Sequence, residues 1–361
     1  MKMLAIVFFL LPLLGAGYVS WRTWQILPLA PIVKGSLIIL FWLGLVVMVL
    51  SFIVGLDSVS LPLARILYEI GNSWIFILLY LFMLFLVLDF GCLIHLIPHS
   101  LMKSSIVGSL IVVCLMLVFF VYGNVHYYNK VRVPLSLKSS KPLTKPLKIV
   151  MISDLHLGYH NSRNEFAKWV DKLNAEQPDL ILIAGDVIDI SIRPLIEEGT
   201  AEEFRRLKAP IYACLGNHEY YSGEPLAQKF FDEAKIKLLR DKAVVDNDIC
   251  IVGRDDRTNP LRMSVRKLMQ QADTSKYIIL LDHQPYHLEL AERAGVDFLF
   301  SGHTHHGQVW PISWITDAIY ECAYGTHQRG NTQYYVSSGI GIWGGKFRIG
   351  TQSEYVVATL E

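Results

Sequence analysis

The first third of the sequence contains very little charge. Residues 1–129 hold only eight of the 65 Lys, Arg, Asp and Glu side chains in the 361-residue chain. Soluble domains carry about a quarter of their residues as charged side chains, so this scarcity excludes a soluble N-terminal domain. The first third is therefore predicted to lie in lipid.

The rest of the chain lacks the marks of three other protein classes. Its charges are nearly balanced, 28 basic against 29 acidic, which argues against the clustered basic face of a nucleic-acid-binding protein. Three of the five cysteines lie there, and no CxxC pair occurs, so neither a disulfide framework nor a zinc ribbon is expected. Cys214 lies in the apolar run 211–215 and is interpreted as a buried strand residue, not a nucleophile.

Four apolar stretches of the first third are long enough to cross a hydrocarbon layer, which takes about 20 helical residues. These predicted spans lie near 3–21, 35–56, 73–97 and 105–127. The first is interpreted as a retained helix, because Arg22-Thr23-Trp24 follows it without a clean small-x-small cleavage site and three further spans come after it. Residues 1–129 are thus predicted to be an all-α transmembrane bundle of about four helices.

Three ionisable residues, Asp89, His95 and His99, lie in or just after the third span. Such groups are costly in hydrocarbon unless they face protein or the interface. They line a head-group pocket in one interpretation, and in the other they are helix-end residues that reach the interface.

Residues 130–147 are predicted to be a basic, proline-containing linker on the membrane surface. From Lys130 to Lys148 the chain has six basic residues, three prolines and no acidic residue. With four spans, both ends of the bundle lie on one side, which then holds eight basic residues against three on the other. The positive-inside rule predicts a cytoplasmic C-terminal domain on the cell (inner) membrane.

Residues 148–361 are predicted to form an α/β domain with two packed sheets flanked by helices. Short apolar runs alternate with helical patterns in the first half, and further apolar runs follow with less helix between them. The predicted strands are 147–153, 180–184, 211–215, 249–252, 277–282, 298–300, 334–337 and 355–359, and the predicted helices are 165–175 and 201–207.

Polar residues follow five of these strands directly. They are Asp154-Leu155-His156, Gly185-Asp186, Gly216-Asn217-His218-Glu219, His283 and Gly302-His303-Thr304-His305. Ligands bind at the carboxyl ends of strands in α/β sheets, so we expect these residues to meet. Carboxylate, amide and imidazole groups without thiolate suit Mn²⁺, Zn²⁺, Fe or Mg²⁺, and two such ions together can clamp a phosphoryl group.

In the order and residue types of these motifs, residues 148–361 resemble the calcineurin-like metallophosphoesterase superfamily. Gly307-Gln308 extends the last motif as in the bacterial membrane-associated branch of that superfamily. The resemblance implies two divalent metal ions, with Mn²⁺ favoured. It places Asp154, His156 and His305 on one metal, Asn217, His283 and His303 on the other, and Asp186 between both. It also implies that His218 protonates the leaving group.

Two further residues match supporting positions of the superfamily. Glu219 is expected to orient His218, and Asp189 to support the metal site, with a surface-loop carboxylate as the alternative for Asp189. His306 stands where the branch usually has glycine, so some backbone strain is expected if that position has positive φ. His160, His287 and His327 lack a strand-end setting and are not expected to bind metal.

Two other groups of residues leave alternatives open. Residues 254–257, Arg-Asp-Asp-Arg, could contact a phosphate, although solvated loop charges are commoner. Late aromatic residues could line an acyl groove or rest on the bilayer, with core packing as the default. They are Trp310, Trp314, Tyr320, Tyr324 and Trp343.

The sequence therefore predicts a membrane-bound hydrolase of phosphodiester, phosphomonoester or pyrophosphate bonds. Four spans exceed what tethering needs, and the resembling branch includes the UDP-diacylglucosamine hydrolases, so a lipid-linked substrate is preferred. The alternatives are a phosphodiesterase of soluble or envelope-derived esters that is only tethered to the membrane, and a non-enzymatic scaffold that binds metal or phosphate. The sequence predicts no oligomeric state.

Overall fold

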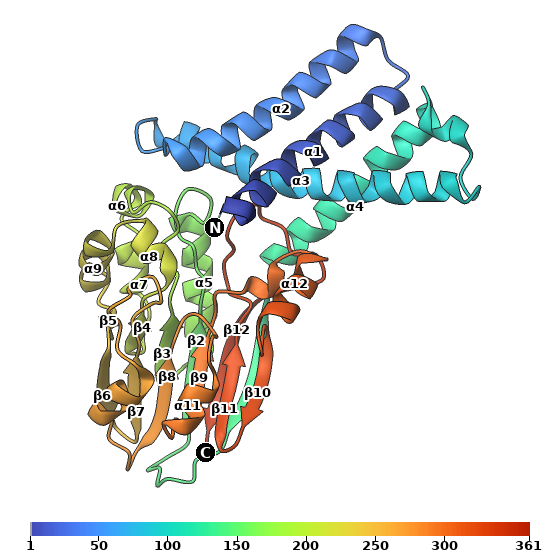
Figure 1. Ribbon diagram of the computed structural model, residues 1–361. Helices are drawn as coiled ribbons and strands as arrows, with labels where there is room; N and C mark the ends of the chain where they lie inside the picture. The colour runs from blue at the N-terminus through green and yellow to red at the C-terminus, as the bar shows by residue number, and fades with distance from the viewer. Residues whose placement is uncertain (1) are drawn as a thin grey trace. The chain divides into compact units, whose positions relative to one another are not determined.

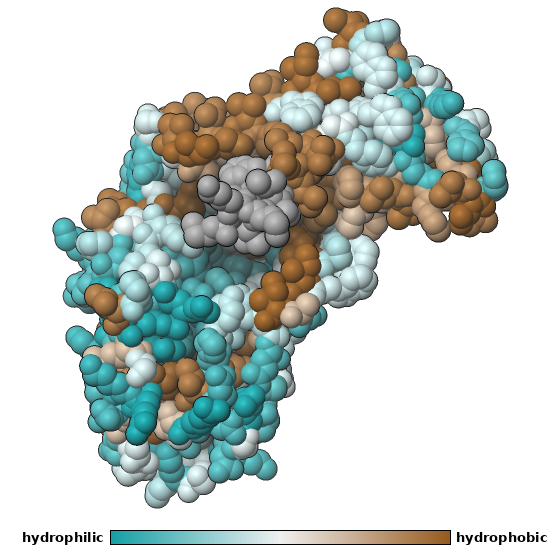
Figure 2. Space-filling model, in the orientation of Figure 1, coloured by the Kyte–Doolittle hydropathy of each residue, from teal (hydrophilic) through white to brown (hydrophobic). Residues whose placement is uncertain are grey.

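The computed structural model describes residues 2–361, with side-chain surroundings described from Leu10 onward (Figure 1). The chain divides into two compact units. The first comprises the chain up to Gly123 together with the short segment Gly344–Lys346, and the second comprises Asn124–Trp343 and Phe347–Glu361. Figure 2 shows largely apolar side chains on the visible face of the first unit and largely polar ones on that of the second.

The first unit is built from long helices. They are α1 (Lys2–Ile26), α2 (Pro31–Ile53), α3 (Leu61–Leu93) and α4 (Ile106–Tyr128), with the short 3-10 helix η1 (His99–Met102) between the last two. By length and composition, α2, α3 and α4 could each cross a membrane. The predicted span 3–21 falls within α1, partly on residues whose side chains lie outside the description. Helix α3 begins at Leu61, well before the expected residue 73.

Asp89 on α3 is paired within the helical unit. Its carboxylate lies 2.6 Å from Arg22 of α1 and accepts a hydrogen bond of 2.5 Å from the Tyr18 hydroxyl. A cavity of about 320 Å³ is lined by Arg22, Asp89, His95 and His99, among others. Both histidines are exposed just beyond the end of α3, which agrees with their interpretation as helix-end residues.

The second unit contains two sheets, as predicted, and each sheet has six strands. The first sheet has the order β1-β12-β2-β3-β4-β5 and the second β10-β11-β9-β8-β7-β6. The strands are β1 (Lys130–Leu137), β2 (Leu147–Ile152), β3 (Leu180–Ala184), β4 (Ile211–Cys214), β5 (Lys237–Leu238), β6 (Lys242–Asp246), β7 (Ile249–Gly253), β8 (Tyr277–Leu281), β9 (Phe298–Ser301), β10 (Gly325–Arg329), β11 (Thr332–Val336) and β12 (Ser353–Leu360).

Short helices connect the strands. They are α5 (Arg163–Ala175), α6 (Arg193–Glu198), α7 (Ala201–Phe204), α8 (Asn217–Tyr221), α9 (Glu224–Glu233), α10 (Val265–Leu268), η2 (Met269–Gln271), α11 (Glu289–Arg293), η3 (His305–Gly307) and α12 (Ile312–Ile319). Helix α5 begins after Ser162, whose hydroxyl accepts a hydrogen bond from the Glu165 backbone N–H and thereby satisfies one donor of the first turn.

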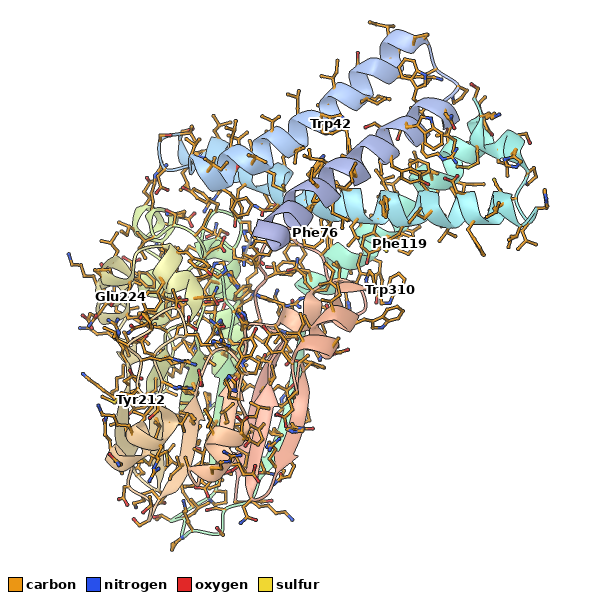
Figure 3. All side chains as sticks on the ribbon, in the orientation of Figure 1. Trp42, Phe76, Phe119, Tyr212, Glu224 and Trp310 are labelled. Atoms are coloured by element: carbon orange, nitrogen blue, oxygen red, sulfur yellow. The ribbon has the colours of Figure 1, made fainter. Side chains whose placement is uncertain are left out.

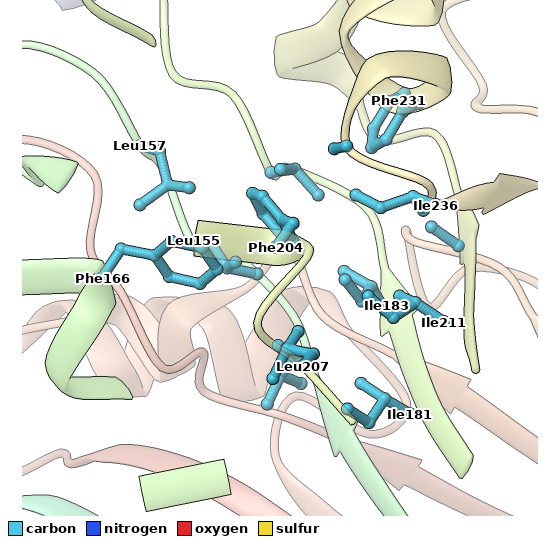
Figure 4. Packing of buried hydrophobic residues seen from close by; sticks show 14 of the residues in the cluster. Leu155, Leu157, Phe166, Ile181, Ile183, Phe204, Leu207, Ile211, Phe231 and Ile236 are labelled. Carbon is cyan, nitrogen blue, oxygen red and sulfur yellow. The ribbon is translucent and has the colours of Figure 1, made fainter. Parts of the chain in front are cut away.

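Alternation along the strands divides the core into layers. In β2, Ile149 and Met151 pack with residues of the second sheet, whereas Val150 and Ile152 pack with helices on the outer face. Successive side chains of a strand point to opposite faces of the sheet, so the residues of one apolar run are buried alternately in the two core layers. Figure 4 shows the outer layer, in which the ring of Phe204 lies next to that of Phe166, with centroids 4.3 Å apart. A further apolar cluster covers the outer face of the second sheet.

The segment predicted as a linker contains a strand of the first sheet. Residues Lys130–Leu137 form β1, which pairs in parallel with β12 along its whole length. Leu137 is fully buried in the core between the sheets. Only Asn129 separates β1 from the end of α4, so the sheet begins almost directly after the last apolar helix and before the expected boundary at residue 148.

Deleting residues 1–146 is therefore expected to destabilise the second unit, whereas deleting residues 1–123 is not. The longer deletion uncovers the edge of β12 and removes Leu137, and loss of one fully buried leucine side chain alone costs about 2–5 kcal/mol. Thermal unfolding midpoints of the two purified fragments measure the difference. Equal midpoints would show that β1 contributes nothing to the fold.

Candidate metal centre

The first group of predicted ligands comes from the ends of β2 and β9. Asp154, His156 and His305 are buried, and each places one ligand atom within 4.8 Å of the others. Nε2 of His156 lies 3.0 Å from Nε2 of His305, and Asp154 Oδ1 lies 3.5 Å from the same His305 atom. Two imidazole nitrogens and a carboxylate at this spacing could hold one divalent cation.

The second group comes from the ends of β3, β4, β8 and β9. Asp186, His283 and His303 also place ligand atoms within 4.8 Å of one another. The amide oxygen of Asn217 lies 2.9 Å from Nδ1 of His303. These four residues could hold a second cation.

Asp186 lies between the two groups. Its Oδ2 is 3.0 Å from Nε2 of His283 in one group and 3.7 Å from Nε2 of His156 in the other. A single carboxylate that faces both groups is placed as a bridging ligand requires. The structure thus brings all seven predicted ligands together at one edge of the two sheets.

The orientation of two histidine rings fits bound cations. Nδ1 of His283 lies 2.7 Å from the carbonyl oxygen of Ala184, which can only accept a hydrogen bond. Nδ1 of His156 similarly lies 3.2 Å from the Asp189 carboxylate. In the neutral rings these contacts hold the proton on Nδ1, so the lone pair of Nε2 points into the centre. In the centre, each Nε2 lone pair faces the lone pairs of other predicted ligand atoms. A bound cation would remove the repulsion between these lone pairs.

His303 and His305 are held in the neutral form that binds metal. Burial, assisted by the charge of His283, lowers the pKa of His303 to about 4. Burial and the neighbouring His156 lower the pKa of His305 well below its ordinary value. Both rings therefore offer a lone pair at neutral pH, and no proton has to be displaced from them when a cation binds. Burial would also lower the pKa of His283, but the charge of Asp186 raises it well above its ordinary value.

The backbone of the centre is strained. Left-handed φ angles between 44° and 72° occur at five of the seven predicted ligands, Asp154, His156, Asp186, His303 and His305. Each such residue other than glycine costs of order 1–3 kcal/mol and persists only where surrounding structure enforces it. Such strain gathers at functional sites, and here it aims side chains from three strand ends, those of β2, β3 and β9, at one point.

Two motif glycines are required by close packing at the centre. A Cβ on Gly216 would lie 2.2 Å from Oδ1 of Asp186, and one on Gly302 would lie 2.2 Å from Oδ2 of Asp154. Neither contact can be relieved without moving a predicted metal ligand. The glycines of the Gly-Asn-His and Gly-His-x-His motifs thus allow the ligand carboxylates to approach the neighbouring backbone.

Asp189 is a buried residue of the centre, not a surface carboxylate. Its Oδ1 lies 3.2 Å from Nδ1 of His156 and 3.3 Å from Nδ1 of His218. Burial opposes its ionisation, but the hydrogen bonds from these two histidines lower its pKa. Burial would also lower the pKa of His218, but the charges of Asp186 and Asp189 raise it to about 9. At neutral pH His218 is therefore protonated, as a general acid must be.

Glu219 has a different position from the one expected. Its carboxylate accepts backbone hydrogen bonds from Gly216 at 2.7 Å, Ile188 at 2.9 Å and Asp186 at 3.0 Å. The expectation that Glu219 orients the His218 ring is therefore wrong, because Asp189 makes that contact. Glu219 instead ties together the loops after β3 and β4, which carry Asp186 and Asn217.

His306, which replaces the usual glycine, does have positive φ, at 48°. Its ring stacks on Tyr324 with centroids 4.7 Å apart and planes 13° apart. Its Nε2 also lies 3.4 Å from the carboxylate of Asp317 on α12. These two contacts offset the expected strain and fix the backbone next to His305.

Most of the charged loop 254–257 is buried, so its interpretation as solvated is wrong for Arg254, Asp255 and Asp256. Asp256 accepts hydrogen bonds from Gln284 at 2.9 and 3.1 Å, next to the predicted ligand His283. The negative charge of Asp256 acts to raise the pKa of both His283 and His303. No local pattern around Asp256 indicates this role, because the contact joins loops after different strands.

Arg348 was not singled out by any motif, yet it is fully buried beside the centre. Its guanidinium donates to the backbone carbonyl oxygens of His305 at 2.8 Å, Ser338 at 2.5 Å and Gly341 at 3.0 Å. Burial lowers its pKa to about 10, which still leaves it charged at neutral pH. Arg348 therefore fastens the loop after β11 to the segment that carries His305.

The late aromatic residues do not form one core cluster. Trp310 and Trp314 are 41% and 65% exposed, so core packing is wrong for both. Figure 3 labels Trp310 near the start of α12. Ile315 and Ile319 on α12 are also more than half exposed, and Figure 2 shows apolar side chains where Figure 1 places this helix. The α12 face, defined here as Trp310, Trp314, Ile315 and Ile319, is an apolar surface that begins five residues after the motif ending at His305.

Comparison with known proteins supports the interpretation of this site as the metal centre of a phosphoesterase. The model of the calcineurin-like phosphoesterase family matches residues 147–307. An uncharacterised metallophosphoesterase of Campylobacter jejuni is 32% identical over 252 residues, 68% of this chain and 67% of that protein. Another, of Helicobacter pylori strain J99, is 31% identical over 220 residues, and the match spans 59% of each chain.

A further relative has a name that mentions the membrane. The transmembrane protein with metallophosphoesterase domain of Danio rerio is 28% identical over 310 residues, 76% of this chain and 70% of that protein. The apolar helices of the first unit agree with this similarity. The chain is a membrane protein and belongs to the calcineurin-like phosphoesterases, a family of metal-dependent phosphoester hydrolases that use two divalent cations.

Proposed function

We propose that this protein hydrolyses phosphate esters linked to membrane lipids, using two divalent cations held by the seven residues of the centre. The observation that best supports a hydrolytic activity is the position of Asp186 between two groups of ligand atoms. The residues in the two groups are those that the superfamily resemblance assigns to the two metals. Mn²⁺ is the favoured ion, because carboxylate, amide and imidazole ligands without thiolate suit it.

The protein's own residues supply orientation and a proton. When bound, the two metal ions would polarise the phosphoryl group and activate water for attack. His218 holds a proton at the edge of the centre, and Asp189 fixes its ring from behind. Donation of this proton to the departing oxygen lets the leaving group depart as a neutral alcohol instead of an unstable alkoxide.

The lipid part of the proposal rests on the α12 face. Tryptophan and isoleucine side chains exposed on an amphipathic helix are typical of segments that lie in the membrane interface. The same helix ends beside the centre, because Tyr320 follows it directly and its ring lies 6.3 Å from that of His303. A helix that rests on the head-group layer would therefore hold the centre close to lipid phosphates.

A substrate screen tests the proposal. The full-length protein in mixed micelles is incubated with total bacterial lipid extract and Mn²⁺, and the products are identified by mass spectrometry. A metal-dependent decrease in one phosphorylated lipid, with appearance of its hydrolysed product, is expected. Hydrolysis of water-soluble esters with no change in any lipid would support the alternative of a tethered general phosphodiesterase. No hydrolysis of any ester at full metal occupancy would support the metal-binding scaffold.

Replacing Trp314 by serine is expected to lower activity on a lipid substrate in vesicles by roughly tenfold, since burial of a large apolar side chain contributes about 1.5–3 kcal/mol. Activity on a soluble chromogenic ester should stay near the wild-type value, because Trp314 is 65% exposed and touches no predicted ligand. Val245→Ser, on the half-exposed strand β6, is the matched control. An equal loss on both substrates would argue against interfacial contact by α12.

The positive-inside pattern also leads us to propose that the centre lies on the cytoplasmic side of the cell membrane. Labelling of a single cysteine introduced in the second unit by a membrane-impermeant reagent tests this orientation. Labelling in intact cells would reverse it.

A further inference from the structure

One arginine near the centre has no acidic partner. In the loop after β7, Arg254 and Arg262 both pair with Asp282, at 2.9 and 3.1 Å. Arg257 of the same loop is exposed and, within the described part of the chain, makes no ion pair. The adjacent Asp256 does not neutralise it, because that carboxylate is fully buried and faces Gln284.

Arg257 is nevertheless held in place. Its guanidinium carbon lies 4.1 Å from the centroid of the Tyr286 ring, as in a cation–π contact. A guanidinium that stacks in this way keeps its edge N–H groups free, and two of them can bind one anion at the same time. The Arg257 side chain is thus positioned like a binding group, although no hydrogen bond or ion pair among the described residues uses its donors.

Two tyrosines connect this arginine to the metal centre. The Tyr286 hydroxyl donates a hydrogen bond of 3.0 Å to the Tyr320 hydroxyl, and the two rings lie 4.8 Å apart. The Tyr320 ring in turn lies 6.3 Å from the ring of the predicted ligand His303. Because its oxygen accepts from Tyr286, Tyr320 keeps its own O–H for another acceptor. Arg257 and Tyr320 therefore offer unused donors on the same side of the centre.

We infer that Arg257 and Tyr320 form a second anion subsite, which binds a phosphate attached to the phosphoryl group undergoing hydrolysis. The inference rests on the proposed phosphoesterase activity and narrows its substrate class to pyrophosphate esters. The first phosphoryl group would lie at the metal ligands, and the second would receive hydrogen bonds from the guanidinium and the phenol. A simple diester has no group for this subsite.

Two matched compounds test the inference with the full-length protein in detergent. Bis(p-nitrophenyl) phosphate and P1,P2-bis(p-nitrophenyl) pyrophosphate carry the same aryl groups and differ by one phosphate. The kcat/KM for each is measured by chromatography for the wild type and for Arg257→Gln, Arg257→Lys and Arg266→Gln. Arg266 is the control, since it is an exposed arginine on α10.

Arg257→Gln is expected to lower the ratio of kcat/KM for pyrophosphate over phosphate by about tenfold or more, as loss of a charge-assisted contact predicts. Arg257→Lys keeps the charge without the planar donor pair, so its ratio should lie between those of the wild type and Arg257→Gln. Arg266→Gln should leave the ratio unchanged.

Other outcomes overturn the inference in distinguishable ways. A loss by the same factor on both compounds would assign Arg257 a structural role. A wild type that cleaves the phosphate but not the pyrophosphate would exclude this substrate class while the proposed activity stands. A wild type that cleaves neither compound, and no ester in the lipid screen at full metal occupancy, would overturn the proposed function itself.

Discussion

Asp186→Asn is expected to reduce kcat for any phosphate ester by about three orders of magnitude or more. The change removes the one negative charge that faces both groups of ligand atoms, and metal ions contribute several kcal/mol of charge stabilisation to such reactions. The amide oxygen can still accept the 2.9 Å hydrogen bond that Oδ1 receives from the His218 backbone. The fold should therefore be retained, and the loss of kcat should result from weaker binding of the cations.

Metal content and activity have to be measured together. We expect elemental analysis to show two bound divalent ions per wild-type chain and fewer in Asp186→Asn, with unchanged circular dichroism. Asp232→Asn is the matched control, because Asp232 is an exposed carboxylate on α9 away from the predicted ligands. Near-wild-type kcat for Asp186→Asn at verified metal depletion would exclude a two-metal mechanism.

The regular strands were predictable because local pattern and burial agree. Runs such as 180–184 and 277–281 are entirely apolar and short, and each is a strand with every residue buried. Parallel strands covered on both faces require this composition. Since polar motifs follow these runs directly, their convergence at the strand ends could also be predicted from the sequence.

Strand β1 was missed for a physical reason. It lies at the edge of its sheet, where only one neighbour pairs with it, and edge strands tolerate charge and proline. Lys130, Arg132 and Pro134 occupy alternate positions in it, so the segment has the composition of a surface linker. The alternating Val131, Val133, Leu135 and Leu137 were the available signal.

The residues that support the centre could not be predicted from short motifs. Arg348 follows Gly341 in an irregular loop and reaches His305 only after the chain has folded. Asp256 and Tyr320 likewise approach His283 and His303 through loops whose paths no local pattern encodes. Short motifs predict which side chains bind metal, but tertiary packing decides what surrounds them.

His218→Asn is expected to lower kcat by about 10² to 10⁴-fold for esters with alkyl leaving groups, the usual contribution of a general acid. For p-nitrophenyl esters the loss should be much smaller, because p-nitrophenolate departs without a proton. His287→Asn, which changes a largely exposed histidine, is the control. The measurement is kcat across a series of aryl and alkyl esters at constant metal occupancy.

The dependence on the leaving group separates proton donation from any structural role of His218. If the ring only supports Asp189 or the neighbouring Asn217, the variant should lose the same factor on every ester. If it protonates the departing oxygen, the loss should grow steadily as the leaving group becomes more basic. Parallel lines for wild type and variant would remove His218 from the reaction, and diverging lines would place its proton on the leaving oxygen.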